Sequence, residues 1–130
     1  MTDRLLRAIE CPWVDILAHP TGRRILRREP SRARMESVFE AALRHGVAVE
    51  INCQPERLDM DDILARRARE RAVRIVIDTD AHSPAALGNL RWGVTVARRA
   101  WLEAKDVLNT RPFDEFRTSL RRNRHAGTAR

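Results

Sequence analysis

The residues best suited to chemistry are Asp80 and His82, which stand two positions apart in a polar segment. In extended backbone the side chains of residues i and i+2 project to the same side, so this carboxylate and imidazole can converge on one point. One oxygen and one nitrogen ligand suit Mn²⁺, Zn²⁺ or iron, whereas calcium prefers oxygen ligands alone. The pair is therefore a candidate metal site. A helix cap at Asp80 with an ordinary polar contact at His82 is the competing interpretation.

Two other polar segments carry side chains that could join this site. His19 precedes Pro20, and a single histidine there is either a ligand or an ordinary loop residue. Glu50 follows an apolar run, where a carboxylate is costly unless it is paired or hydrogen-bonded. It either orients a ligand or bonds to neighbouring backbone. Asn52 follows two residues later, and Cys53 has no base beside it in the sequence, which argues against a nucleophilic thiol.

Apolar runs that lead into these polar segments predict three strands, over residues 14–17, 47–51 and 74–78. Apolar residues at helical spacing predict helices over residues 5–9, 35–43, 59–72, 87–101 and 112–120. Gly46 is expected to end the second helix and Asp59 to cap the third. The apolar stripe of the fourth helix, from Leu87 to Trp101, is expected to pack in the core.

The alternation of strands with helices predicts βαβ units and a parallel sheet, within a doubly wound sheet or a (βα) barrel. In both architectures the active site lies beyond the carboxyl ends of the strands. The alternation therefore predicts that the polar segments near residues 19, 52 and 80 meet at one edge of the sheet.

The composition is that of one ordinary globular domain, with 130 residues of which 43% are hydrophobic. No apolar run has the length of a membrane span, and the first residues lack a secretory signal. Cys11 and Cys53 form no paired framework and indicate thiols in a reducing compartment. We therefore expect a cytoplasmic protein with no membrane partner.

The net charge of +7 comes from two groups of arginines. Five lie beyond the last acidic residue, and a second group follows the His19 segment: Arg23, Arg24, Arg27, Arg28, Arg32 and Arg34. Lys105 is the only lysine among the 25 basic residues, which indicates a general arginine bias. The groups are either solvated surface charge or a patch that binds a phosphate backbone. The sequence contains no Gly-rich phosphate loop, GxSxG elbow or zinc-finger spacing.

Several segments resemble the PHP (polymerase and histidinol phosphatase) domain that is attached to bacterial family X DNA polymerases. Residues 15–23 read DILAHPTGR, which is similar to the family's DILGHPTGR. Residues 49–52 and 55–59 read VEIN and PERLD, which resemble its LEIN and NPxRLDL, and TDAHS follows at residues 79–83. Residues 91–94, 97–102 and 106–110 also resemble its closing segments. The similarity covers residues 2–122 in the family's order and spacing.

This resemblance implies the C-terminal portion of an irregular (βα)₇ TIM-like barrel over residues 1–122, followed by a basic tail over 123–130. It implies a metal-dependent phosphoesterase, either a phosphatase or a 3′-5′ exonuclease that acts on DNA 3′ ends. Up to three Mn²⁺ or Zn²⁺ ions occupy the complete family site. By motif, His19, Asp80 and His82 are the implied metal ligands. Glu50 and Asn52 are implied near the reacting centre, and Arg23 is a candidate for binding the substrate phosphate.

Some family features are missing from the sequence. The family site also uses an early His-x-His pair, and no histidine precedes His19. We therefore expect a truncated, catalytically incomplete piece with little activity alone, or one whose missing strands come from a partner chain or oligomer. The alternative is a non-catalytic remnant that binds nucleic acid or a partner through its arginines. Asp78 stands where the family has a neutral residue, and it is expected either to alter the choice of metal or to pair with a cation.

Overall fold

The computed structural model describes residues 1–120, so the tail expected over 123–130 lies outside the described residues. Its strands are β1 (Ile16–Leu17), β2 (Ala48–Asn52) and β3 (Ile75–Asp78). Its helices are α1 (Thr2–Glu10), α2 (Met35–His45), α3 (Asp62–Glu70), α4 (Leu90–Arg99) and α5 (Phe113–Ser119). Short 3₁₀ turns span Pro84–Asn89, Ala104–Asp106 and Leu108–Thr110.

The sheet is parallel, in the order β1–β2–β3, and its strands alternate with helices as the sequence predicts. The register pairs Leu17 with Val49 and Asn52 with Asp78. This arrangement fits part of a TIM-like fold. The described residues form three strands and do not close a barrel.

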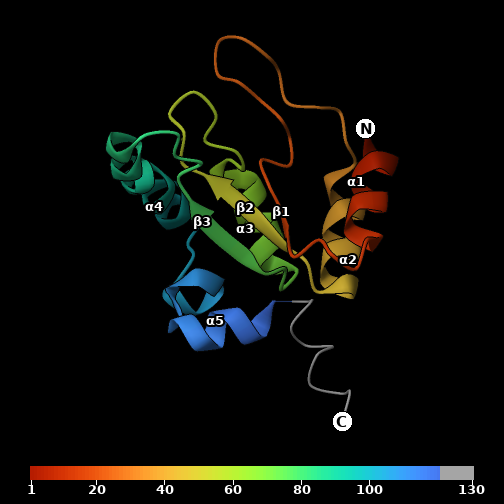
Figure 1. The fold of residues 1–130 in the computed structure, drawn as a ribbon. Coiled ribbons are helices and arrows are strands. Elements are labelled where there is room, and N and C mark those ends of the chain that lie inside the picture. The colour runs from red at the N-terminus through yellow and green to blue at the C-terminus, as the bar shows by residue number, and fades with distance from the viewer. Residues whose placement is uncertain (121–130) are drawn as a thin grey trace.

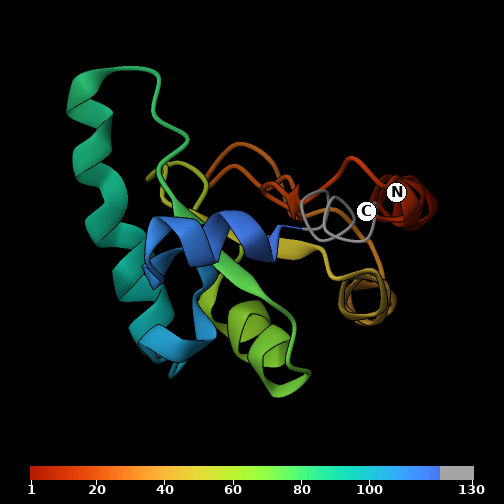
Figure 2. The same cartoon turned by 60° about the horizontal axis from the view of Figure 1, so that its bottom comes forward.

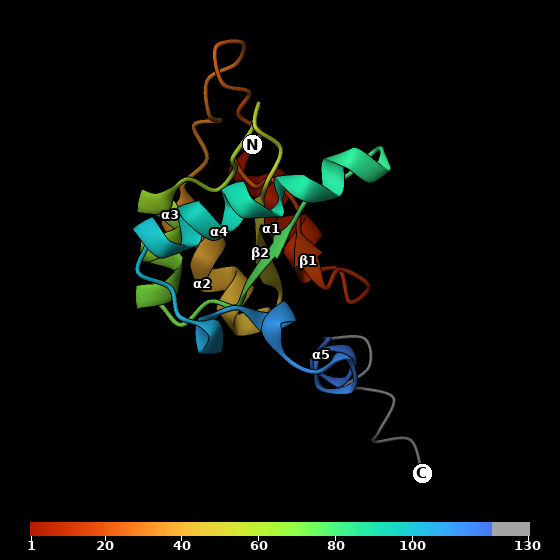
Figure 3. The same cartoon turned by 90° about the vertical axis from the view of Figure 1, so that its left-hand side faces the viewer.

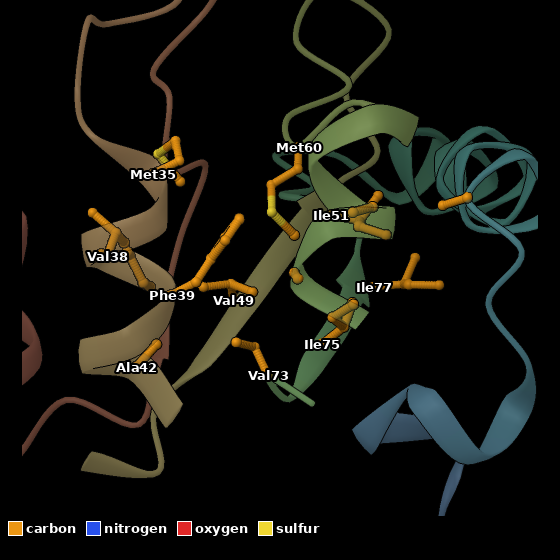
Figure 4. Close-up of a cluster of buried hydrophobic side chains, with 14 of the residues drawn as sticks. Met35, Val38, Phe39, Ala42, Val49, Ile51, Met60, Val73, Ile75 and Ile77 are labelled. Atoms are coloured by element: carbon orange, nitrogen blue, oxygen red, sulfur yellow. The ribbon is translucent and has the colours of Figure 1, made fainter. Parts of the chain in front are cut away.

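Helices α1 and α2 pack against each other on one side of the sheet (Figures 1 and 2). Helix α2 buries Val38, Phe39 and Ala42 completely, and Phe39 lies beside Val49 of β2 (Figure 4). Gly46 ends α2 in the left-handed region, with φ 66°, as its position predicts. The sequence pattern therefore identified this helix and most of its buried face, but Leu43, which belongs to the predicted apolar stripe, is 51% exposed.

Helix α3 differs from its prediction at its start. It begins at Asp62, and its cap is Asp61, whose carboxylate accepts a hydrogen bond from the Leu64 N–H at 2.8 Å. Asp59 is buried and accepts instead from the backbone N–H groups of Thr21 and Gly22. The Asp59 carboxylate, which local spacing predicts as the helix cap, is therefore used in a long-range contact with the segment after β1.

The apolar stripe expected to pack in the core is largely exposed, which makes that prediction wrong. Leu87, Leu90, Val94 and Trp101 all lie on the surface, whereas Ala97 is buried. Helix α4 instead contacts β2 and β3 through its smaller residues, including Gly93 and Ala97 (Figure 3). A Cβ atom at Gly93 would lie 2.7 Å from Ile77 Cγ2 and closer still to Cys53 Sγ. Because the helix lies so close to the sheet, only its face of small residues fits at the contact.

The outer edge of β3 is covered by the segment that follows α4. Val107 pairs with Ile75, and the Asn109 side chain accepts from the Ile77 N–H at 3.1 Å and donates to the Ile77 carbonyl at 2.7 Å. Covering an edge in this way prevents further strand pairing. The described residues provide no such cover for the outer edge of β1. No described helix has the length and apolar character needed to cross a membrane.

Candidate functional site

The three segments singled out in the sequence lie together at the carboxyl edge of the sheet (Figure 1). Strand β1 leads into the segment of His19, β2 ends at Asn52, and β3 leads toward Asp80. Because the strands are parallel and adjacent, these three ends lie at the same edge of the sheet. Open α/β sheets bind ligands at this edge.

Asp80 and His82 line one pocket of about 470 Å³. The His82 Nδ1 atom lies 2.7 Å from the Asp80 carbonyl oxygen, a geometry in which Nδ1 donates its proton. The Nε2 atom then keeps its lone pair and is the ring nitrogen able to bind a cation. The other lining residues are Arg24, Gln54, Glu56, Arg57, Ser83 and Ala86.

Asn52 connects the exits of β2 and β3. Its buried side-chain amide donates to Glu50 Oε2 at 3.3 Å and to Asp80 Oδ2 at 3.2 Å. Its Oδ1 atom accepts from the Gln54 N–H at 3.0 Å, and Gln54 Nε2 donates in turn to the Asp80 carbonyl at 2.7 Å. Asn52 therefore orients the Asp80 carboxylate, which is a positioning role.

His19 joins this network through its backbone. Its N–H donates to the Glu50 carboxylate, and its φ of 29° lies in the left-handed region. The His19 side chain is half-buried and does not line the pocket of Asp80 and His82. Among residues 1–120, no three His, Cys, Asp or Glu side chains are grouped to hold a metal ion.

Glu50 is buried beside a second carboxyl group, that of Asp78. Burial first, and then the hydrogen bond to Asp78, raise the pKa of Glu50 to about 8, against the lowering effect of the His19 N–H. Asp78 also accepts from the Asp80 N–H at 3.1 Å. At neutral pH the Glu50 carboxyl is therefore mainly protonated and can donate to Asp78. The partner of Asp78 within the described structure is this carboxyl group rather than a cation.

Arg23, the candidate for phosphate binding, uses its guanidinium to hold the segment after β2. It donates to the Arg57 carbonyl at 2.7 Å and to the Leu58 carbonyl, and it pairs with Asp61 at 3.4 Å. A phosphate would have to compete with these contacts. Arg23 as a phosphate ligand stays a prediction.

Arg57 is a functional candidate that the sequence analysis did not single out. It lines the pocket, its Nε lies 4.0 Å from Asp80 Oδ2, and its Nη1 is buried with no hydrogen-bond partner among the described residues. The signal for it was present in PERLD, the segment that resembles the family's NPxRLDL. Cys53, in contrast, is buried, and burial raises the pKa of its thiol to about 12, so it stays neutral.

No protein-family model matches the chain. The curated proteins that it matches are named as a DNA polymerase/3′-5′ exonuclease and as probable phosphatases. One is the DNA polymerase/3′-5′ exonuclease PolX of Bacillus subtilis (strain 168), 41% identical over 120 residues, or 92% of this chain and 21% of that protein. A probable phosphatase of Thermoanaerobacter sp. (strain X514) is 30% identical over 115 residues, or 84% of this chain and 44% of that protein.

A probable phosphatase of Caldanaerobacter subterraneus subsp. tengcongensis is also 30% identical over 115 residues, or 43% of its own length. The chain thus spans about a fifth of the polymerase and less than half of each phosphatase. It is similar to one part of a PolX-type protein and to one part of each probable phosphatase.

Proposed function

We propose that this chain is the C-terminal portion of a PHP-type, metal-dependent phosphoesterase and contributes His19, Asp80 and His82 to a site for Mn²⁺ or Zn²⁺. The observation that carries the proposal is that Asp80 and His82 line one pocket at the carboxyl edge of the sheet, with His82 Nδ1 held by the Asp80 carbonyl. The similarity to a named exonuclease and to probable phosphatases supports the reaction class.

The donor set fits a metal ion only in part. Asp80 and His82 supply an oxygen and a nitrogen beside one pocket, whereas the third proposed ligand, His19, does not line that pocket, and residues 1–120 form no group of three candidate ligands. When bound, a divalent ion neutralises charge on phosphate oxygens. Because the site is incomplete in residues 1–120, we expect the chain alone to hydrolyse phosphoesters slowly or not at all.

The residues of the pocket have distinct proposed roles. Arg57 binds the substrate phosphate, because it lines the pocket, its Nε lies 4.0 Å from Asp80 Oδ2, and its Nη1 has no protein partner in the described part of the chain. Asn52 keeps the Asp80 carboxylate oriented. The protonated Glu50 anchors the backbone of His19.

Calorimetric titration of the metal-stripped chain with Mn²⁺ tests the proposal. We expect micromolar binding that is lost in Asp80→Ala/His82→Ala. The matched control, Asp114→Ala/His45→Ala, removes the same side-chain types from α5 and α2 and should bind normally. Absence of specific binding, or equal loss in both double variants, would contradict the site.

A second titration, of the Mn²⁺-loaded chain with inorganic phosphate, distinguishes the proposed role of Arg57 in phosphate binding from the structural role of Arg23. Arg57→Ala should weaken phosphate binding while the folded state keeps its stability. Arg23→Ala should instead lower the free energy of unfolding by about 1–3 kcal/mol, because it leaves the partly buried carbonyl groups of Arg57 and Leu58 without this donor. Phosphate binding that depends on Arg23 and not on Arg57 would reverse these roles.

A further inference from the structure

A pocket of about 240 Å³, which we name the basic pocket, lies at the edge of the sheet opposite to Asp80 and His82. Its lining comes from the end of α3, from the turn before β3 and from the segment between α4 and α5. Figure 1 shows this last segment, in blue, beside the amino end of the sheet. In TIM-like barrels the active site lies at the carboxyl edge, and the amino edge contributes to stability. A ligand in the basic pocket is therefore separate from the candidate reaction.

The lining of the basic pocket carries an excess of positive charge. Its charged side chains are four cations and one carboxylate: Arg69, Arg74, Lys105, Arg111 and Asp106. The excess of three charges compares with none in the pocket of the candidate site, none in a hollow of about 210 Å³ along α3, and two in a hollow of about 220 Å³ after β1. The basic pocket is thus the most positively charged of these four hollows.

Two of the four cations are held in place by the protein. Arg69 Nε donates to Asp106 Oδ2 at 3.0 Å, and Arg74 Nη1 donates to the Ser119 carbonyl at 2.8 Å. Both arginines are half-buried, so a ligand that meets them has little further ordering to impose. Asp106 Oδ2 also accepts from the Glu103 N–H at 2.9 Å. The one carboxylate of the lining is therefore already used within the protein.

The other two cations are exposed and lightly held. Lys105 pairs with Glu103 at 2.9 Å, but the two side chains are 69% and 61% exposed, and such a surface pair contributes little stability. Arg111 is exposed and forms no ion pair with a carboxylate of residues 1–120. Neither side chain is fixed by burial, so both can turn toward an anion in the pocket.

We propose that the basic pocket binds a small oxyanion with two negative charges, either inorganic phosphate or the phosphate group of a small monoester. Guanidinium groups bind phosphate oxygens through paired N–H donors, and a lysine adds a compact point charge. The pocket is smaller than those that hold drug-sized ligands, which are roughly 300–1,000 Å³. Its size therefore suits a single phosphate group. This binding does not depend on the proposed function.

A bound anion connects two parts of the fold. Two of the cations precede β3, whereas Lys105 and Arg111 belong to residues 104–111, the segment that covers the outer edge of β3. Backbone pairing and the Asn109 side chain hold this segment to the strand. The anion adds a further link between them, and local opening of the segment becomes less frequent.

The test is calorimetric titration of the full chain with inorganic phosphate, in EDTA and at an ionic strength kept constant with chloride. Lys105→Gln/Arg111→Gln removes the two exposed cations of the basic pocket. The matched control, Arg44→Gln/Arg98→Gln, has the same net charge and removes two exposed arginines from the last turns of α2 and α4, outside the pocket. Thermal melts establish that each variant is folded.

We expect the pocket variant to bind phosphate about tenfold more weakly or worse, because charge-assisted hydrogen bonds are lost, and the control to bind as the wild type does. Phosphate should also slow hydrogen exchange within residues 104–111 of the wild type and not of the pocket variant. Titration with glycerol phosphate distinguishes the two sources: binding of either anion supports the proposal, and the tighter one identifies the preferred form.

Three results would overturn the proposal. The first is that phosphate changes neither the heat signal nor the melting temperature at constant ionic strength. The second is equal weakening of binding in both double variants. The third is loss of binding in Arg57→Ala or Arg28→Gln, which would place the anion in another hollow.

The result is independent of the metal site, because EDTA removes divalent ions. Phosphate binding in EDTA that requires Lys105 and Arg111, without any Mn²⁺ affinity, would reject the proposed function alone. Mn²⁺ affinity without phosphate binding in EDTA would reject this inference alone.

Discussion

At the scale of single residues, the candidate site depends on how buried polar side chains are paired. The Asn52 amide donates to the side chains of both Glu50 and Asp80, and Asp59 accepts from the N–H groups of Thr21 and Gly22. Buried polar groups are stable only when they are hydrogen-bonded. The loops that carry the candidate ligands are therefore ordered by side chains that are not themselves the implied ligands.

The raised pKa of Glu50, about 8, makes a prediction for the dependence of stability on pH. The folded chain keeps a proton that an ordinary glutamate of the unfolded chain, with a pKa of 4.5, releases. The folded state thus binds more protons between about pH 5 and pH 8, and this group makes the free energy of unfolding decrease as pH rises through that window. Glu50→Gln keeps the neutral shape and removes the titration.

We therefore expect the Glu50→Gln variant to lose less stability than the wild type from pH 5 to pH 8, by on the order of 1 kcal/mol or more. Urea unfolding in EDTA at several pH values measures this difference. The exposed Glu115→Gln variant serves as the control and should follow the wild type. Parallel curves for Glu50→Gln and the wild type would mean that Glu50 is ionised in the folded chain.

At the scale of elements, helix α4 shows why an apolar stripe did not identify the packed face. The helix meets the sheet at Gly93, where the absence of a Cβ lets Cys53 and Ile77 approach the backbone. Leu90, Trp92 and Val94 of the same helix remain exposed. Close packing of helix and sheet favours a small residue at the point of contact over a more hydrophobic one.

Gly93→Ala should therefore destabilise the chain by about 1–3 kcal/mol through overpacking, although alanine favours an isolated helix by roughly 1 kcal/mol. Gly88→Ala is the matched control, because no atom lies within 4 Å of the Cβ it would add. Urea unfolding of both variants provides the measurement. A Gly93→Ala chain as stable as wild type would show that α4 can move away from the sheet at little cost.

At the scale of the whole molecule, apolar surface and one strand edge remain open within the described residues. Leu87, Leu90 and Val94 lie at helical spacing on one exposed face, and β1 has a strand partner on one side only. Contiguous apolar surface and unpaired edges favour association.

We therefore expect the chain to self-associate as its concentration rises, and Leu87→Ser/Leu90→Ser to weaken that association. Sedimentation velocity over a series of concentrations tests this expectation. Leu43→Ser/Ile63→Ser removes two exposed apolar residues from α2 and α3 and is the matched control. A chain that remains monomeric at every concentration would contradict the prediction.

The sequence by itself determined the alternation of elements, the parallel sheet and the edge at which His19, Asn52 and Asp80 gather. These features follow from local periodicity and from the position of polar residues at strand ends, which depend on near neighbours in the chain. The match of TDAHS and DILAHPTGR to known segments likewise required no coordinates. The metal ligands, the implied barrel and residue 122 as the domain boundary stay predictions.

Only the tertiary structure decided which residues those elements bring into contact. Asp59 does not cap α3, because its carboxylate accepts hydrogen bonds from two N–H groups that lie 37 and 38 residues away in the sequence. Arg23 donates to the Arg57 carbonyl after β2, Arg57 lines the pocket, and α4 packs against the sheet at Gly93. Each outcome arises from packing or hydrogen bonding between segments distant in sequence, which local periodicity does not encode.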